Sequence, residues 1–209
     1  MIIIIDYGMG NLRSVAKAAE FLGKTVRVTD SVSVIKKAKK IIFPGVGHFG
    51  KAVQELKKRN IYTLLKERIK EGVPFLGICL GMQLLLTRSD EARTARGLSV
   101  ITGQVKKFSA RNLIVPHMGW NSVKFQVPGS RAQAQRADCL FKRIKDGSFF
   151  YFAHSYYCAP TDKKTILATT DYGVSFTCAL HKDNVWGVQF HPEKSQALGL
   201  RVFNNFLEL

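Results

Sequence analysis

The first third of the chain alternates short apolar runs with amphipathic stretches. Residues 2–5 form a continuous apolar run, and residues 11–22 carry leucine, valine and alanine at helical spacing before Gly23. A short continuous apolar run is typical of a strand buried on both faces, and spacing of three and four is typical of a helix. This order predicts βαβ units, and hence an α/β fold with a mostly parallel central sheet flanked by helices. Further strands are expected at 25–28, 41–43 and 73–78, and further helices at 51–58 and 61–71.

The pattern changes after about residue 98, where shorter β-rich segments are separated by turns. A closing helix is expected at 199–207, and residues 127–145, rich in Arg, Gln and Ala, are expected to form a mobile surface loop. We find no internal repeat, so we expect one domain over residues 1–209, with additional β segments in its C-terminal half. The expected strands of this half are 98–108, 149–153, 165–170, 177–180 and 185–190.

Composition excludes several classes of protein. The longest apolar-rich stretch, residues 75–86, is shorter than the ~18 residues that a membrane span requires. The N-terminus has neither a basic leader nor a small-residue cleavage site, so it predicts a first strand and not a signal peptide. The four cysteines show neither CxxC spacing nor a dense framework, which argues against a zinc site and a disulfide-stapled secreted fold. We expect a cytoplasmic protein with no membrane span and no metal.

The net charge of +17 raises nucleic acid as a partner. The lysines and arginines recur in short runs along the chain, without interleaved aromatic residues and without a nucleic-acid motif. A solvated basic surface is therefore favoured over a nucleic-acid face. A basic nucleic-acid-binding module stays open as an alternative function.

Cys79 stands at the end of the expected strand 73–78, between Gly77 and Gly81. Small residues on both sides of a nucleophile permit the sharp strand-to-helix turn that exposes it at the carboxyl edge of a sheet. The amides at the start of the following helix would favour a thiolate. This pattern predicts a nucleophilic cysteine, although a structural cysteine between packing glycines would have the same pattern.

A second segment supplies a base and its orienting group. In an extended segment, side chains two positions apart share a face, so His191 and Glu193 can lie together across Pro192. Cleavage of an amide by a thiolate requires a proton for the departing nitrogen and a carboxylate that fixes the imidazole tautomer. Together with Cys79, the pair predicts a catalytic triad. Taken alone, it is more typical of a structural ion pair.

A glycine-rich turn follows the strand expected at 41–43. Its glycines let backbone N–H groups approach a ligand, so Gly45, Val46 and Gly47 are candidates for an oxyanion hole opposite Cys79. An ordinary βα turn is the alternative, and a phosphate cradle is disfavoured because the Walker lysine is absent.

Six segments of the chain combine into a family resemblance. They are 6–11 (DYGMGN), 44–49 (PGVGHF), 77–83 (GICLGMQ), 116–121 (PHMGWN), 154–157 (HSYY) and 189–195 (QFHPEKS). Together they resemble the class I, triad-type glutamine amidotransferases, which have a flavodoxin-like fold, and among these the glutaminase subunits of imidazole glycerol phosphate synthases. The resemblance spans essentially the whole chain.

The resemblance implies a substrate, a partner and roles for further residues. It implies that glutamine is held by Gln83 and by the backbone of Ser155 and Tyr156, and that a cyclase subunit in a heterodimer receives the ammonia. It implies no cofactor. The residues that would lie toward the cyclase are Pro116, His117, Met118, Gly119, Trp120 and Lys194. Without the resemblance, Gln83 would be interpreted as a solvated helix residue, Trp120 as a core aromatic and Lys194 as an exposed lysine.

Two segments depart from the family pattern. Residues 87–96 are more basic than the acidic segment usual there, and residues 127–137 are longer and more polar than expected. Neither departure touches the triad. They leave open a paralogous synthase that amidates surface sugars as the alternative partner.

Overall fold

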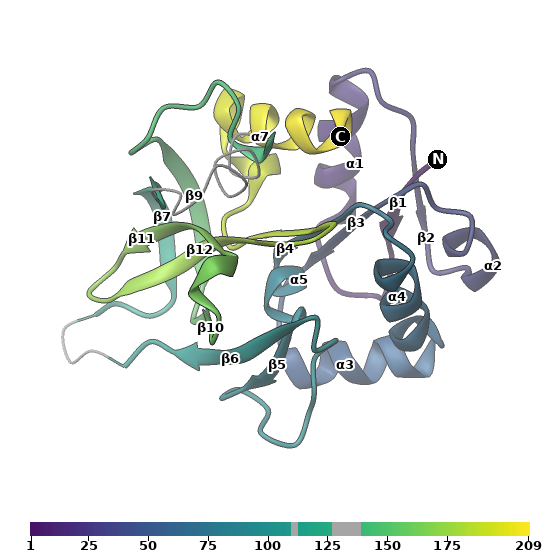
Figure 1. Cartoon of the computed structure of the whole chain (residues 1–209), viewed down its shortest axis with the longest axis horizontal. Helices are drawn as coiled ribbons and strands as arrows, with labels where there is room; N and C mark the ends of the chain where they lie inside the picture. Colours follow the sequence, from purple (N-terminus) through teal and green to yellow (C-terminus); the bar gives the residue numbers. More distant parts are fainter. Residues whose placement is uncertain (110–112, 127–138) are drawn as a thin grey trace.

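The computed structural model describes residues 1–109, 113–126 and 139–209. One mixed sheet has the strand order β2-β1-β3-β4-β13-β12-β10-β6-β5, and a separate two-stranded sheet lies at one end (Figure 1). Off this path, β11 pairs with β12, and β8 pairs with β11. The central parallel strands are β1 (Ile2–Ile5), β2 (Val26–Thr29), β3 (Lys40–Gly45), β4 (Phe75–Cys79) and β13 (Val185–Val188).

The remaining strands belong mainly to the C-terminal half. The large sheet continues through β12 (Ser175–Lys182), β10 (Tyr156–Pro160), β6 (Ile101–Lys107), β5 (Leu86–Ser89), β11 (Ile166–Asp171) and β8 (Lys124–Phe125). The small antiparallel sheet pairs β7 (His117–Ser122) with β9 (Phe149–His154). The helices are α1 (Leu12–Phe21), α2 (Val32–Ile35), α3 (Phe49–Lys58), α4 (Ile61–Lys70), α5 (Leu80–Gln83) and α7 (Gln196–Glu208), with 3-10 turns at η1 (Lys163–Thr165) and η2 (Pro192–Lys194).

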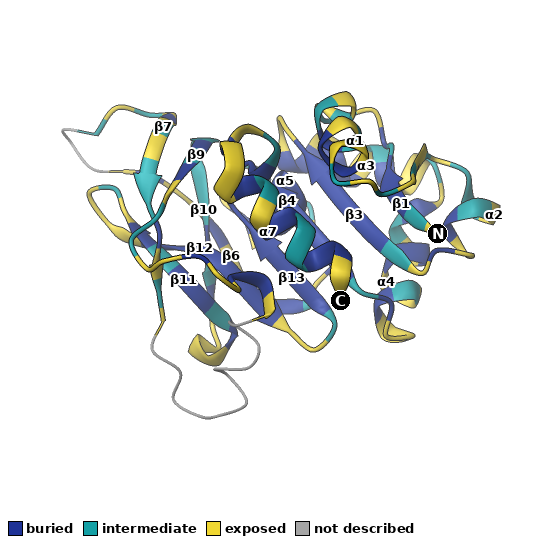
Figure 2. Cartoon of the chain, turned by 90° about the horizontal axis from the view of Figure 1, so that it is seen from above, coloured by how far each residue is buried: buried dark blue, intermediate teal, exposed yellow. Residues whose placement is uncertain are grey.

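Helices cover both faces of the parallel strands. Ile3 and Ile5 of β1 belong to the buried cluster that includes side chains of α3 and α4, whereas Ile4 belongs to the cluster that includes α1 and α7. The two pairs of helices lie on opposite sides of the sheet (Figure 1), and the strands β1, β3, β4 and β13 are almost continuously buried (Figure 2). Both faces of β1 are therefore apolar, which explains why residues 2–5 show no alternation.

The expected α/β fold with a mostly parallel centre is confirmed, and the differences lie at element boundaries and in the C-terminal half. The strand expected at 98–108 begins only at Ile101. β5, β7 and β10 were not expected, because their short polar or mixed sequences lack the alternation that marks a strand. Their extended form depends on pairing with neighbouring strands.

The mobile loop expected at 127–145 needs a correction. Residues 127–138 lie outside the described residues. Leu140 and Phe141 are buried in the same cluster as α7, and Asn205 Nδ2 donates to the carbonyl oxygen of Leu140 (2.9 Å). The expectation of a surface loop is therefore wrong for this end of the segment, because its apolar side chains pack into the core.

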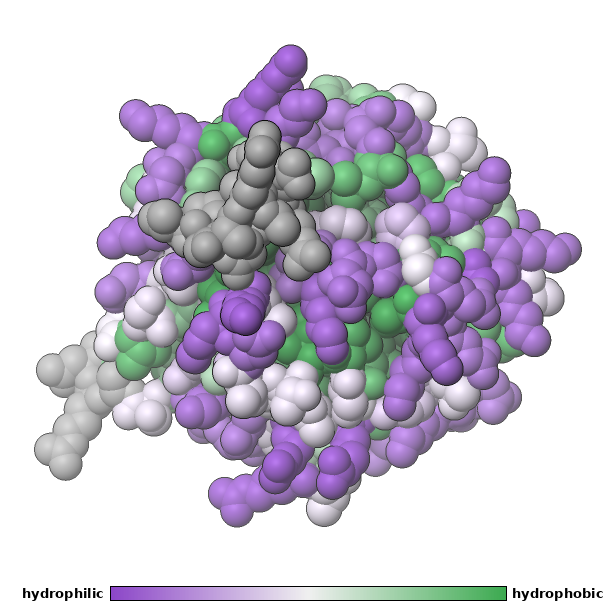
Figure 3. All heavy atoms as spheres, in the orientation of Figure 1, coloured by the Kyte–Doolittle hydropathy of each residue, from purple (hydrophilic) through white to green (hydrophobic). Residues whose placement is uncertain are grey.

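One face of the molecule is largely polar (Figure 3). Figure 3 shows one face covered mostly by hydrophilic side chains, with hydrophobic ones gathered in recesses between them. Within the described residues, no helix has the length and apolar character needed to cross a membrane.

Candidate active site

Cys79 lies at the sharp turn between β4 and α5. Its backbone adopts φ 53° and ψ −109°, a conformation that non-glycine residues rarely occupy. The flanking glycines are required by packing, because a Cβ on Gly81 would lie 1.8 Å from the carbonyl oxygen of Phe43, and one on Gly77 would lie 2.7 Å from that of Gly81. The turn has the geometry of a nucleophile elbow, and the helix after it is a single turn.

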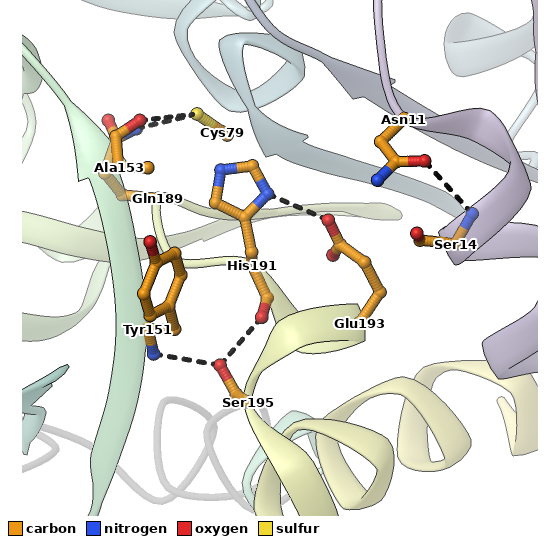
Figure 4. A network of polar contacts seen from close by, with 9 residues as sticks. All are labelled: Asn11, Ser14, Cys79, Tyr151, Ala153, Gln189, His191, Glu193 and Ser195. Carbon is orange, nitrogen blue, oxygen red and sulfur yellow. Dashed lines mark hydrogen bonds and ion pairs between the residues drawn. The ribbon is translucent and has the colours of Figure 1, made fainter. Parts of the chain in front are cut away.

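His191 and Glu193 follow β13, the strand that pairs with β4. His191 Nδ1 lies 2.9 Å from Glu193 Oε1, and the imidazole lies between Cys79 and the carboxylate (Figure 4). The sequence argument placed both residues in an extended segment, but residues 192–194 form a 3-10 turn, and this turn brings the carboxylate back to the ring. The contact between His191 and Glu193 was expected correctly. The extended backbone from which it was argued was wrong.

The position of His191 is fixed by backbone hydrogen bonds to the small sheet. Its N–H donates to the carbonyl oxygen of Tyr151 (2.9 Å), and its own carbonyl oxygen accepts from Ser195 Oγ (2.7 Å). The same Ser195 oxygen accepts from the N–H of Tyr151 (3.0 Å; Figure 4). The base is therefore attached to β9 as well as to β13.

The pKa of His191 reflects two opposing causes. Burial lowers it, but the negative charges of Cys79 and Glu193 and their hydrogen bonds to the ring outweigh burial and raise the pKa to about 10. A protonated imidazole is therefore favoured at neutral pH. Such a ring can supply the proton that a departing amide nitrogen needs.

A cavity of about 330 Å³ opens beside Cys79. Its lining brings together residues from distant segments of the sequence. His191 is not part of this lining and approaches the Cys79 sulfur from the side of β13 and η2 (Figure 4). The expected residues in the lining are Cys79, Val46, Gly47, Gln83, Pro116, Met118, Ser155 and Tyr156. Leu80, Glu91, Ala153 and His154 complete it.

The three oxyanion candidates differ in position. Val46 and Gly47 line the cavity, and Gly47 has φ +100°, which favours glycine. Gly45 does not line it, but stands directly opposite Cys79 in the β3–β4 register. A side chain there would collide with Tyr7 Oη, so Gly45 makes room for the buried side chain of Tyr7.

Gln83 is buried, so the alternative of a solvated helix residue is wrong. Its Nε2 donates to the carbonyl oxygen of Tyr156 (2.9 Å) and to Gln189 Oε1 (3.1 Å). Gln189 Nε2 in turn donates to Cys79 Sγ (3.6 Å). Gln189 was not singled out from the sequence, although an amide in the apolar run before His191 was a usable signal.

Glu91 was also missed. Its Oε2 accepts a 2.6 Å hydrogen bond from the N–H of Phe49, the first residue of α3, and its side chain lines the cavity. It therefore connects segment 87–96 to the turn at Gly47. Nothing in its local sequence distinguishes it from an exposed acidic residue.

The residues expected to face a partner fall on both sides of β7. Met118 (66% exposed) and Trp120 (47% exposed) share the outer face, as two positions apart in a strand require. His117 is 3% exposed, so its side chain is turned away from that surface. The exposed Lys194 places its Nζ 5.8 Å from the ring centre of Tyr151, which contacts Trp120 edge-on.

The other cysteines take no part in this site. Cys158 and Cys178 are buried, and burial raises the pKa of both thiols, that of Cys178 to about 12. Cys139 is exposed and does not line the cavity. Among the described residues, no group of three or more His, Cys, Asp or Glu side chains is arranged to hold a metal ion.

Comparison with known proteins agrees with this geometry. The family model "Glutamine amidotransferase class-I" matches residues 3–209. Solved structures with the same fold include a protein described as glutamine amidotransferase (TM-score 0.74, 16% identity, covering 100% of this chain and 98% of that one). Another is PurLQS from Thermotoga maritima (TM-score 0.70, 18% identity, covering 99% of this chain and 97% of that one).

Curated relatives are much closer in sequence, and the three described next are each named imidazole glycerol phosphate synthase subunit HisH. The protein of Methanocaldococcus jannaschii is 47% identical over 212 residues, covering 100% of both chains. That of Moorella thermoacetica is 46% identical over 208 residues, covering 100% of this chain and 94% of the relative. That of Chlorobaculum tepidum is 42% identical over 209 residues, covering 100% of both. The chain therefore belongs to the class I glutamine amidotransferases and, within them, to the family of HisH subunits of imidazole glycerol phosphate synthase.

Proposed function

We propose that this chain, acting as a single domain of 209 residues in the cytoplasm, hydrolyses glutamine to glutamate and ammonia through Cys79, His191 and Glu193. The observation that carries the proposal is the position of Cys79. Its side chain lines a cavity of about 330 Å³ and lies beside a buried imidazole that Glu193 orients (Figure 4). Nucleophile, base and orienting carboxylate are thus assembled beside a space for a small substrate.

The chemistry proceeds in two balanced steps. The Cys79 thiolate attacks the side-chain amide carbon of glutamine, and the oxygen of the tetrahedral intermediate is held by backbone amides of the Val46–Gly47 turn. His191 gives its proton to the departing nitrogen, ammonia leaves, and a γ-glutamyl thioester remains. Water then attacks the thioester, His191 accepts its proton, and glutamate and the thiolate are released.

We further propose that the ammonia is used by a cyclase subunit bound as a heterodimer, in the reaction that forms imidazole glycerol phosphate and an aminoimidazole carboxamide ribonucleotide in histidine biosynthesis. The full-length similarity to HisH subunits supports this partner over a synthase that amidates surface sugars. Met118 supports the location of the interface, because it lines the cavity and is also exposed beside Trp120. A partner on this face would cover the cavity mouth.

The decisive experiment compares Cys79→Ala with Cys139→Ala in the reconstituted complex. Loss of the nucleophile should reduce glutamine-dependent turnover by at least ~10⁴-fold, because no other covalent route exists. Synthesis from ammonium salt at alkaline pH should persist, since the cyclase needs only ammonia. Cys139→Ala removes an exposed thiol and should leave both activities unchanged.

Each outcome has a clear meaning. A Cys79→Ala complex that still hydrolyses glutamine would refute the triad. One that also fails with ammonium would make Cys79 structural. Stimulation of glutamine hydrolysis by a surface-sugar synthase subunit, and not by the cyclase, would replace the proposed partner.

A further inference from the structure

A continuous chain of hydrogen bonds runs from β7 to the nucleophile. It begins at Asn121, whose Nδ2 lies 3.3 Å from His117 Nε2, and continues from His117 Nδ1 to His154 Nε2 over 3.1 Å. His154 Nδ1 then lies 2.8 Å from the carbonyl oxygen of Tyr156. That oxygen also accepts from Gln83, which leads through Gln189 to Cys79 Sγ.

The two ends of this chain fix the protons within it. The carbonyl of Tyr156 can only accept, so His154 Nδ1 carries a proton, and Asn121 Nδ2 can only donate, so His117 Nε2 is bare. Burial lowers the pKa of His117 to about 4 and that of His154 to about 3, so both rings are neutral at pH 7. Each ring is then the Nδ1–H tautomer, and His117 donates to His154.

Aromatic packing holds His117 in place. Its ring stacks on Tyr172, with centroids 3.9 Å apart and planes at 25°, and on Phe152, at 4.9 Å and 23°. His117 therefore cannot turn freely away from His154. The Asn121 amide and the Tyr156 carbonyl at its two ends set the donor-to-acceptor direction of this hydrogen-bond chain. The aromatic rings packed on His117 set its geometry.

The carbonyl oxygen of Tyr156 is where the chain meets the site. Its two lone pairs are taken by His154 Nδ1 (2.8 Å) and Gln83 Nε2 (2.9 Å). Because Gln83 uses its other N–H for Gln189, its amide has one satisfied orientation, and that orientation leaves Gln189 Nε2 free to donate to Cys79. Loss of the donor on His154 would leave the Tyr156 carbonyl, which forms part of the cavity wall, less firmly held. It would also loosen the Gln83 and Gln189 amides that lead to the Cys79 sulfur.

We propose that His117 and His154 are positioning residues of the glutaminase reaction, which transmit the placement of β7 to the Tyr156 wall and the Gln83–Gln189 donors beside Cys79. This inference rests on the proposed function. β7 also carries Met118 and Trp120 on its outer face, so a partner that docks there contacts the strand that holds the first members of the chain.

Three variants test the proposal through steady-state kinetics. His154→Phe keeps a ring but removes the donor, and should raise the KM for glutamine about tenfold, the effect of one lost buried hydrogen bond. The kcat should change less than about threefold, since the triad is intact. His154→Asn can place an N–H near the position of Nδ1, and should restore KM to within about threefold of the wild type. His117→Phe should raise KM in the same direction.

His181→Phe is the matched control. His181 is also buried, but it packs on Trp186 near the opposite end of β13 from His191. This variant can lose stability but should keep its KM for glutamine. An equal rise of KM in His181→Phe, or none in His154→Phe, overturns the proposal.

The tautomers give a readout independent of activity. In two-dimensional ¹H–¹⁵N spectra of the wild-type imidazoles at pH 7, His117 and His154 should both be neutral with the proton on Nδ1. A proton on Nε2 of His154, or a charged ring, overturns the proposal even if every variant fails to fold. If the wild-type protein hydrolyses glutamine and the His154 variants have the same KM, this inference is wrong and the proposed function stands. If Cys79→Ala is active, the proposed function is wrong.

Discussion

His191 Nδ1 lies 2.9 Å from Glu193 Oε1, and both side chains are almost wholly buried. Only one oxygen of the carboxylate is used, because Glu193 Oε2 has no hydrogen-bond partner among the described residues. Among the described residues, this carboxylate therefore has the imidazole of His191 as its hydrogen-bond partner. Its charge, together with that of Cys79, outweighs the effect of burial on the ring.

Removing either charge should lower the pKa of His191 from about 10 toward its ordinary value of 6.5. Glu193→Gln keeps an oxygen for the Nδ1 proton but loses the charge, and Cys79→Ala removes the other anion. Histidine NMR titration of both variants measures the change. An unchanged pKa in both would show that neither group acts on the ring.

The same pair makes stability depend on pH. The folded pKa of His191 is above its unfolded value, so its contribution is fully present below about pH 6.5 and is lost as pH rises toward about 10. The difference in unfolding free energy between wild type and Glu193→Gln should therefore be largest near pH 6 and shrink by pH 10. Urea denaturation at pH 6, 8 and 10 measures it, and a constant difference would contradict the linkage.

Gly81→Ala should disrupt the turn at Cys79. Because the new Cβ would lie 1.8 Å from the Phe43 carbonyl oxygen, the backbone must move, at a cost of about 3 kcal/mol. Gly147→Ala is the control, since its site is open and its φ of +75° costs only ~1–2 kcal/mol. Equal losses of unfolding free energy in the two variants would mean that the turn relaxes without penalty.

Trp120→Ala should weaken coupling and leave the chemistry intact. Trp120 is half-exposed and contacts Tyr151 edge-on, so the loss of a large aromatic anchor should reduce partner-stimulated turnover by about 30-fold or more. Iodoacetamide should still alkylate Cys79 at the wild-type rate. Phe21→Ala removes an exposed aromatic from α1 and should change neither measurement. If the partner stimulates the turnover of Trp120→Ala as strongly as that of the wild type, Trp120 does not belong to the interface.

Tyr7→Phe should not destabilise the protein. Tyr7 is fully buried beneath Gly45, and its hydroxyl has no hydrogen-bond partner among the described residues. Removal of an unsatisfied group should leave the unfolding free energy unchanged or raise it by up to ~1–2 kcal/mol. Tyr62→Phe, which loses a 2.7 Å bond to the Gly97 carbonyl, should cost ~1 kcal/mol. A larger loss in Tyr7→Phe would reveal a hidden partner.

The sequence determined the parallel half of the fold and the identity of the nucleophile. Strands buried on both faces must be apolar throughout, so β1, β3 and β4 are marked by composition alone. The turn at Cys79 is also marked locally, because only glycine fits at Gly77 and Gly81. The glycines mark this turn within a few residues of sequence, although glycine is required at position 81 because Phe43 of the neighbouring strand β3 packs against it.

Tertiary structure decided which distant residues meet. Gln189 and Cys79 are 110 positions apart, and they come together because β13 pairs with β4, an adjacency that no local pattern encodes. The short strand β7 forms only through its pairing with β9, and that pairing buries His117 and exposes Trp120. Local sequence sets backbone preference and burial at short range, whereas strand order brings together the polar partners of the site.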